Sequence, residues 1–169
     1  MNTRLHIGII LMLVCAVLLP TSPVTAQGAT HTHFTAVASS LCFVAQPDPR
    51  CSLGEIKPLP NGKAIIHDFV NVVRFEAEDD RYTGIGVVNI DLAPGSSGSF
   101  PFQGTWKFVP DKYDGYWEGT ISERVTQEGE YNETSAKGYG ALDGLLLMSR
   151  TRGGSVHEVE IIELPSYSR

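Results

Sequence analysis

The chain has 169 residues, 13 of them basic and 19 acidic, so its formal charge near neutral pH is −6. No Lys/Arg cluster is longer than two residues. Nucleic acids and anionic membrane surfaces are bound through basic patches, so the composition excludes both as expected partners. The length fits one domain of ordinary size, large enough to bury a core.

The first 26 residues are typical of a signal peptide. A basic residue, Arg4, precedes an apolar stretch over 7–19. Val24 and Ala26 place small residues at the −3 and −1 positions of a cleavage site, which predicts cleavage before Gln27. A membrane anchor is the alternative, but thirteen apolar residues are too few for a bilayer span of about 20. We therefore predict an exported chain, secreted or periplasmic, with no membrane anchor after cleavage. The single predicted domain, 27–169, has 12 basic and 19 acidic residues and a formal charge of −7.

Two cysteines, Cys42 and Cys51, lie in the exported part. An even pair at short spacing predicts a disulfide in an oxidising compartment. The residues between them include two prolines and are typical of a loop. A metal thiolate pair or a redox couple is less favoured, because the spacing is not Cys-x-x-Cys and no histidine is close in sequence.

Alternating apolar and polar residues predict strands through most of the chain, and no helical period is present. The first strand is expected to begin at Thr32 and to end at Cys42, followed by the cysteine loop and a Pro-rich connection over 56–62. The longest candidate, 64–77, should pair with 82–92 as an antiparallel hairpin across the acidic turn 78–81. After a flexible loop at 93–99, five more strands are expected at 102–109, 116–125, 131–138, 142–150 and 156–164.

These eight strands predict an all-β fold, an eight-stranded antiparallel β-barrel, whose interior is just wide enough for side chains or one small ligand. Glycines that interrupt the later strands are typical of bends and corners in a closing barrel. An open sandwich fits the same pattern and stays an alternative. No internal repeat or second domain is detected.

Four segments also carry a resemblance to a known group. The residues Trp117-Glu118-Gly119-Thr120 and Gly138-Tyr139-Gly140-Ala141-Leu142-Asp143-Gly144-Leu145 are similar to bacterial exported proteins with an allene oxide cyclase-like barrel. Gly104-Thr105-Trp106 and Asp80-Arg81-Tyr82-Thr83-Gly84 resemble that group as well. The resemblance implies a calycin-like barrel related to allene oxide cyclase and dirigent proteins, with a cavity at one mouth. No active-site residue of the plant cyclase matches, so no catalytic residue is carried over.

One polar residue stands out on the longest strand. In plain alternation, His67 shares a face with Phe69 and Asn71, so it would face a barrel cavity and could act as a general acid or base. A histidine satisfied by its neighbours is the structural alternative. Asn89 would add a polar contact if the register allows. We predict a ligand-binding mouth formed by His67, Phe69, Asn71 and Asn89.

Other candidates are weaker. On the strand 116–125, Glu118 should face solvent and Glu123 should lie inward near the rim. His31 and His33 would place two imidazoles on one side of a strand, which is half of a metal site, but a metal needs three or four ligands. No nucleophile, phosphate-binding or metalloprotease motif is present. We therefore expect neither a metal nor a cofactor.

Together these observations predict an exported small β-barrel that binds a small hydrophobic or aromatic ligand in the barrel mouth. Two alternatives stay open. One is a cofactor-free cyclase or isomerase of the allene oxide cyclase-like kind, which needs mainly a shaped apolar pocket. The other is a structural barrel with no ligand. Self-association into an oligomer is possible, and the sequence does not determine it.

Overall fold

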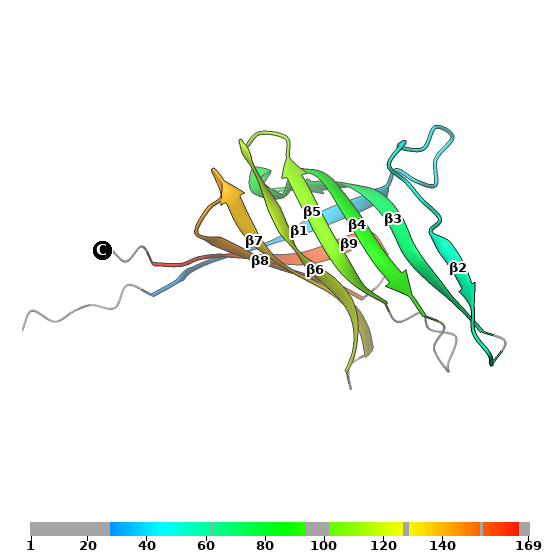
Figure 1. Cartoon of the computed structure of the whole chain (residues 1–169). Helices are drawn as coiled ribbons and strands as arrows, with labels where there is room; N and C mark the ends of the chain where they lie inside the picture. The colour runs from blue at the N-terminus through cyan, green and yellow to red at the C-terminus, as the bar shows by residue number, and fades with distance from the viewer. Residues whose placement is uncertain (1–27, 62, 94–101, 127–128, 153, 166–169) are drawn as a thin grey trace, which may run out of the picture.

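A computed structural model describes residues 28–165 except 62, 94–101, 127–128 and 153 (Figure 1). The predicted signal peptide and most of the predicted loop 93–99 lie outside the described residues. These residues form nine strands and one short 3₁₀ helix: β1 (Thr30–Ser40), β2 (Glu55–Pro58), β3 (Ala64–Ala77), η1 (Asp80–Tyr82), β4 (Gly84–Leu92), β5 (Phe102–Pro110), β6 (Gly115–Thr126), β7 (Gly129–Gly140), β8 (Leu145–Thr151) and β9 (Val156–Glu163). No helix in this part of the chain is long and apolar enough to span a bilayer.

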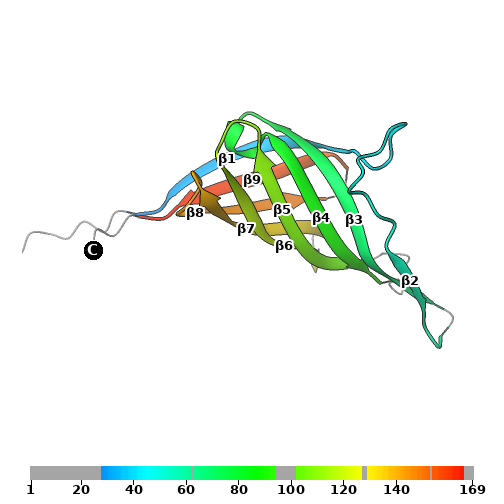
Figure 2. The ribbon, with the colours of Figure 1, turned by 45° about the horizontal axis from the view of Figure 1, so that its top comes forward.

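The strands form one antiparallel sheet in the order β1-β9-β8-β7-β6-β5-β4-β3-β2, and a further pairing of β1 with β3 closes it. The predicted eight-stranded antiparallel barrel is thereby confirmed. β3 is long enough to have two partners on one edge: its first half pairs with β2 and its second half with β1. Figures 1 and 2 show β2 as an extra strand beyond the barrel wall, on the extension of β3.

The barrel closes with a large stagger. A row of paired residues that starts at Val72 on β3 crosses β4 to β9 in turn and reaches β1 at His31. On its other side, the Val72 carbonyl accepts a backbone hydrogen bond from the N–H of Leu41. Leu41 lies ten residues after His31, so one turn around the barrel shifts the register by ten residues. Such a stagger requires strands that are tilted against the barrel axis.

One half of the barrel interior is filled by large side chains. Tyr82 extends from η1 into the barrel, where its ring lies 5.1 Å from both Phe75 and Phe108, and Trp106 stacks on Phe108 at 5.5 Å. Trp117 donates its indole N–H to the Arg81 carbonyl at 2.9 Å, and this bond holds η1 across one end of the barrel. We call this end of the barrel the η1 end. The largest fully buried side chains are Trp106, Trp117, Tyr82, Phe108, Leu142, Leu147, Ile161 and Val72.

Glycine allows the barrel wall to curve where two strands come unusually close. A Cβ on Gly119 would lie 1.9 Å from the Ser135 carbonyl oxygen of β7, and one on Gly104 would lie 2.0 Å from the Asn89 carbonyl oxygen of β4. Real Cβ atoms do not make contacts this short, so only glycine fits at either position. The predicted corners in the wall therefore coincide with close backbone approaches.

The predicted disulfide between Cys42 and Cys51 is confirmed, with 5.6 Å between the two Cα atoms. Its loop lies against the outer face of β3. The Val72 N–H donates to Cys42 Sγ at 3.1 Å, and Ser52 forms an isolated antiparallel bridge with Val70. Val72 is therefore fully buried although it points out of the barrel.

Three of the differences between the predicted and the observed elements have a clear physical reason. β2 overlaps the segment expected to be a Pro-rich connection, because its residues pair with the edge of β3 that β1 leaves free. The first strand begins two residues earlier than predicted and ends at Ser40, where the cysteine loop starts. β8 begins at Leu145 rather than at 142. Leu142 lies in the preceding turn, but its side chain is fully buried, so its apolar character suggested a strand residue.

Candidate functional site

A β-bulge changes which face His67 presents. Ile66 pairs with Leu92 and Phe69 with Ile90, so His67 and Asp68 together oppose the single residue Asp91. Asp68 has a positive φ of 54°, an uncommon conformation that lets the extra residue fit. The backbone N–H of Asp68 donates to the Asp91 carboxylate at 3.2 Å.

His67 therefore lies on the outer face. Its Nδ1 is 3.1 Å from the Asp91 carboxylate, and Asp91 alternates with the core-packed residues Ile90 and Leu92. The expectation that His67 shares a face with Phe69 fails here, because an inserted residue shifts the alternation by one. Asn89 also lies outside the barrel, exposed between two buried neighbours on β4. Neither residue lines the interior.

Phe69 and Asn71 do point inward, as predicted. Phe69 is partly buried and packs against the core. Asn71 is also partly buried, and its Oδ1 accepts a hydrogen bond from the Ser40 hydroxyl at 2.7 Å. That bond ties the inner face of β3 to the end of β1. Of the four predicted site residues, the structure thus brings only Phe69 and Asn71 to the inner face.

The barrel end opposite η1, which we call the Phe102 end, is less completely packed. Its inner face carries four partly buried apolar side chains that contact the core: Phe69, Leu92, Phe102 and Ile121. The strand pairing places them in two adjacent rows. Leu92 pairs with Phe102 in the outer row, and Phe69, Ile90, Gly104 and Ile121 follow one another across β3 to β6 in the next.

Glu123 projects from β6 at this end. Two residues beyond Ile121 on the same strand face, it lies inward, as the alternation predicted, whereas Glu118 is exposed outside. Its Oε2 atom is buried and has no hydrogen-bond partner among the described residues. Buried polar atoms are rarely left unpaired, because desolvation without a partner costs about 1–3 kcal/mol or more for a charged group.

The neighbours of Glu123 on the inner face are also polar. Glu123 pairs with Asn132 on β7, and Asn132 pairs with Thr151 on β8. One row further toward η1, Thr134 and Ser149 are paired and buried. Apart from Ile121, the inner faces of β6, β7 and β8 are thus polar at the Phe102 end, while those of β4 and β5 are apolar there.

A second polar group lies on the inner face of the barrel, with Tyr82 and Ser149 buried and His157 mostly buried. Ser149 Oγ lies 3.3 Å from His157 Nδ1 and also hydrogen-bonds Tyr82. The ring of Phe75 meets His157 edge-on at 5.3 Å. Burial lowers the pKa of His157 to about 4 and raises the pKa of the Tyr82 hydroxyl, so both side chains are neutral near pH 7. With Tyr82 and Ser149 at most 5 % exposed, this group serves packing rather than contact with a ligand.

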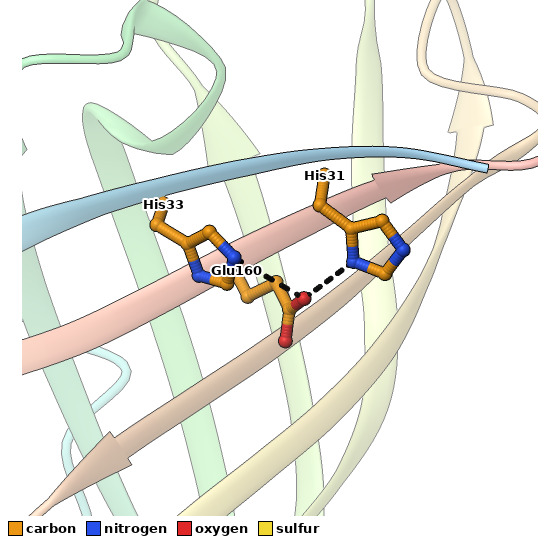
Figure 3. A group of neighbouring side chains, drawn as sticks. All are labelled: His31, His33 and Glu160. Atoms are coloured by element: carbon orange, nitrogen blue, oxygen red, sulfur yellow. Dashed lines mark hydrogen bonds and ion pairs between the residues drawn. The ribbon is translucent and has the colours of Figure 1, made fainter. Parts of the chain in front are cut away.

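The histidine pair is not isolated. On the outer face of β1, His31 Nδ1 lies 2.6 Å and His33 Nε2 lies 3.6 Å from the same oxygen of Glu160 on β9. Figure 3 shows the two imidazoles on one side of the strand, with the carboxylate between them. The register explains this arrangement, since Glu160 is the direct partner of His33. The spacing along β1 predicted that the two histidines lie on one side, but it could not identify Glu160, which lies 127 residues after His33 on β9.

A hollow of about 740 Å³ lies beside this cluster, over the outer faces of β6, β7, β8, β9 and β1. His33 and Glu160 form part of its wall. Most of its other outward side chains are polar or charged, and they include Thr35, Glu78, Thr120, Ser122, Glu133, Ser135, Met148, Arg150 and Glu158. Arg150 is held at 2.8 Å from Glu133.

Comparisons of this chain with protein-family models, with curated proteins and with solved structures gave no match.

Proposed function

We propose that this protein is an exported barrel that binds a small amphipathic molecule inside its Phe102 end. The ligand would have an apolar or aromatic body and one hydrogen-bond-donating or cationic end. Glu123 carries the proposal: its carboxylate oxygen is buried on the inner face without a partner among the described residues. A ligand donor at that oxygen would supply the missing hydrogen bond.

The surrounding side chains support the same ligand class. Ligand pockets combine mostly apolar walls with a few polar groups that set the orientation of the ligand. Phe69, Leu92, Phe102 and Ile121 supply partly buried apolar surface, and each 100 Å² of it removed from water would contribute about 2.5 kcal/mol. A hydrogen bond between a ligand cation and Glu123 would add about 1.5–3 kcal/mol.

Export is part of this proposal. The signal-peptide pattern of residues 1–26 supports it, and a disulfide persists in oxidising compartments outside the cytoplasm. Kinship with the allene oxide cyclase-like barrels is likewise a proposal, supported by the glycine and aromatic motifs and compatible with the eight-stranded barrel.

Two fluorescent probes that differ only at the polar end test the binding proposal. Dansyl-alkylamine and dansyl-alkylcarboxylate of equal chain length would be titrated into the protein and followed by fluorescence enhancement. We expect the amine to bind at least about 10-fold more tightly, because only its polar end carries a cationic donor for Glu123. The Glu123→Gln variant should lose this preference.

Glu118→Gln is the matched control, since Glu118 lies five residues earlier on the same strand but faces solvent. It removes the same charge and should leave the preference for the amine intact. If neither probe binds, the binding proposal is wrong and the alternative of a structural barrel without a ligand is favoured. If both variants reduce the preference equally, the effect comes from net charge and the proposal is wrong.

A further inference from the structure

We propose that His31, His33 and Glu160 form a binding site for a divalent transition-metal ion, Zn²⁺ or Cu²⁺, on the outer face of the barrel. The site is separate from the proposed ligand site, because its three side chains point away from the barrel interior.

The geometry of the three side chains fits a metal. Their ligand atoms all lie within 4.8 Å of one another, and the two imidazoles are nearly parallel, with ring centroids 6.4 Å apart. Zinc binds histidine nitrogen and carboxylate oxygen at about 2.0–2.2 Å, so tetrahedral ligands lie about 3.4 Å apart. The nitrogen-to-oxygen distances of 2.6 and 3.6 Å lie on either side of that value. Small side-chain rotations would suffice to seat an ion.

The ligand types select the class of metal. Two imidazoles and one carboxylate suit Zn²⁺ and Cu²⁺, whereas Ca²⁺ and Mg²⁺ prefer sites built entirely from oxygen. The backbone holds the ligands in place, because all three come from the paired strands β1 and β9. A simple surface ion pair would need only one histidine beside Glu160, but here two imidazoles converge on the same oxygen.

The site is accessible. The side chains of His31 and His33 are 47 % and 68 % exposed, and that of Glu160 is 27 % exposed. Three protein ligands leave at least one coordination position for water or for an added molecule. Because His33 and Glu160 also line the 740 Å³ hollow, a small polar molecule in the hollow could bind the ion there.

Metal titration of the protein without an added histidine tag tests this inference. Zn²⁺ affinity would be measured by competition with a chromophoric chelator, and bound Cu²⁺ would be examined by electron paramagnetic resonance. We expect one ion per chain and nitrogen hyperfine structure from two imidazoles. His33→Ala and Glu160→Gln should each weaken Zn²⁺ binding at least about 10-fold. Even residues that only hydrogen-bond to metal ligands typically contribute about 10-fold, and loss of a ligand should cost no less.

Two control variants use similar groups that do not form the cluster. His67→Ala removes a histidine that pairs with a carboxylate, Asp91, on the same outer surface, and Glu158→Gln removes a neighbouring carboxylate from β9. Both should bind Zn²⁺ as the unmodified protein does. The inference is overturned if the unmodified protein binds no more tightly than His33→Ala, or if a control variant loses as much affinity as Glu160→Gln. Circular dichroism would confirm that each variant is folded.

Discussion

Acid should destabilise the barrel through His157. Its pKa is lowered from about 6.5 to about 4 because the ring is buried beside Phe75 and Ser149. Above pH 6.5 the histidine is neutral in both the folded and unfolded chain, so its contribution to stability is fully present. As the pH falls from about 6.5 toward 4, the unfolded chain binds a proton that the folded chain does not, and that contribution is lost.

The size of the effect follows from the shift. A difference of about 2.5 pKa units corresponds to about 3 kcal/mol. The free energy of unfolding should fall by about 1 kcal/mol at pH 5.5 and about 2–3 kcal/mol at pH 4.5, relative to pH 7.5. Urea unfolding at these pH values would measure the loss, with His157→Gln as the comparison. Asp48, whose pKa is held at about 2 by hydrogen bonds from Arg50, titrates below this window.

The difference in unfolding free energy between the unmodified protein and His157→Gln isolates the contribution of His157. Unfolding free energy should decline less steeply for His157→Gln than for the unmodified protein between pH 6.5 and 4.5. Parallel curves over that range would refute the reasoning, because they would show that His157 takes up its proton as readily in the folded chain as in the unfolded one.

Two further predictions concern stability. Gly119→Ala should lower the free energy of unfolding by about 3 kcal/mol or more, because the added Cβ would overlap the backbone of β7. Gly86→Ala should lower it less, because the added Cβ would contact only side-chain atoms, the nearest at 3.1 Å. Equal losses for the two variants in urea unfolding would contradict the close approach of β6 to β7. Replacing both Cys42 and Cys51 by Ser should lower the free energy of unfolding by about 2–3 kcal/mol. A reducing agent should lower the melting temperature of the unmodified protein but not that of this variant, and no change in either would argue against the disulfide.

The barrel was predictable because most strands alternate cleanly between apolar and polar residues. β4 is an example: Val88 and Ile90 are buried and Asn89 between them is exposed, as period-2 geometry requires. Alternation also predicted that Glu123 points inward and Glu118 outward. β2 was not predictable, because its four residues are all exposed and are ordered only through pairing with β3.

The candidate sites were less predictable, for two physical reasons. One extra residue at Asp68 changes the face of every residue on one side of it, and no strong turn residue marks the bulge in the sequence. Glu160 comes from β9, far along the chain from His33 on β1, and only the strand register brings the two together. Ser149 lies on β8, the strand before His157, but its contact with that ring also depends on the register. His157 does alternate with the buried residues Val159 and Ile161, which was the available signal that it faces the core.

Isoleucine methyl NMR, recorded while the dansyl-alkylamine is added, tests the proposed ligand site most directly. Ile90 and Ile121 face inward near Glu123, whereas Ile85 and Ile162 lie on the outer face of the same barrel. The proposal predicts chemical-shift changes and ligand-to-methyl nuclear Overhauser effects at the inward methyls of Ile90 and Ile121 and none at those of Ile85 and Ile162. Effects at Ile85 or Ile162 without any at the two inward methyls would place the ligand outside the barrel and contradict the proposal.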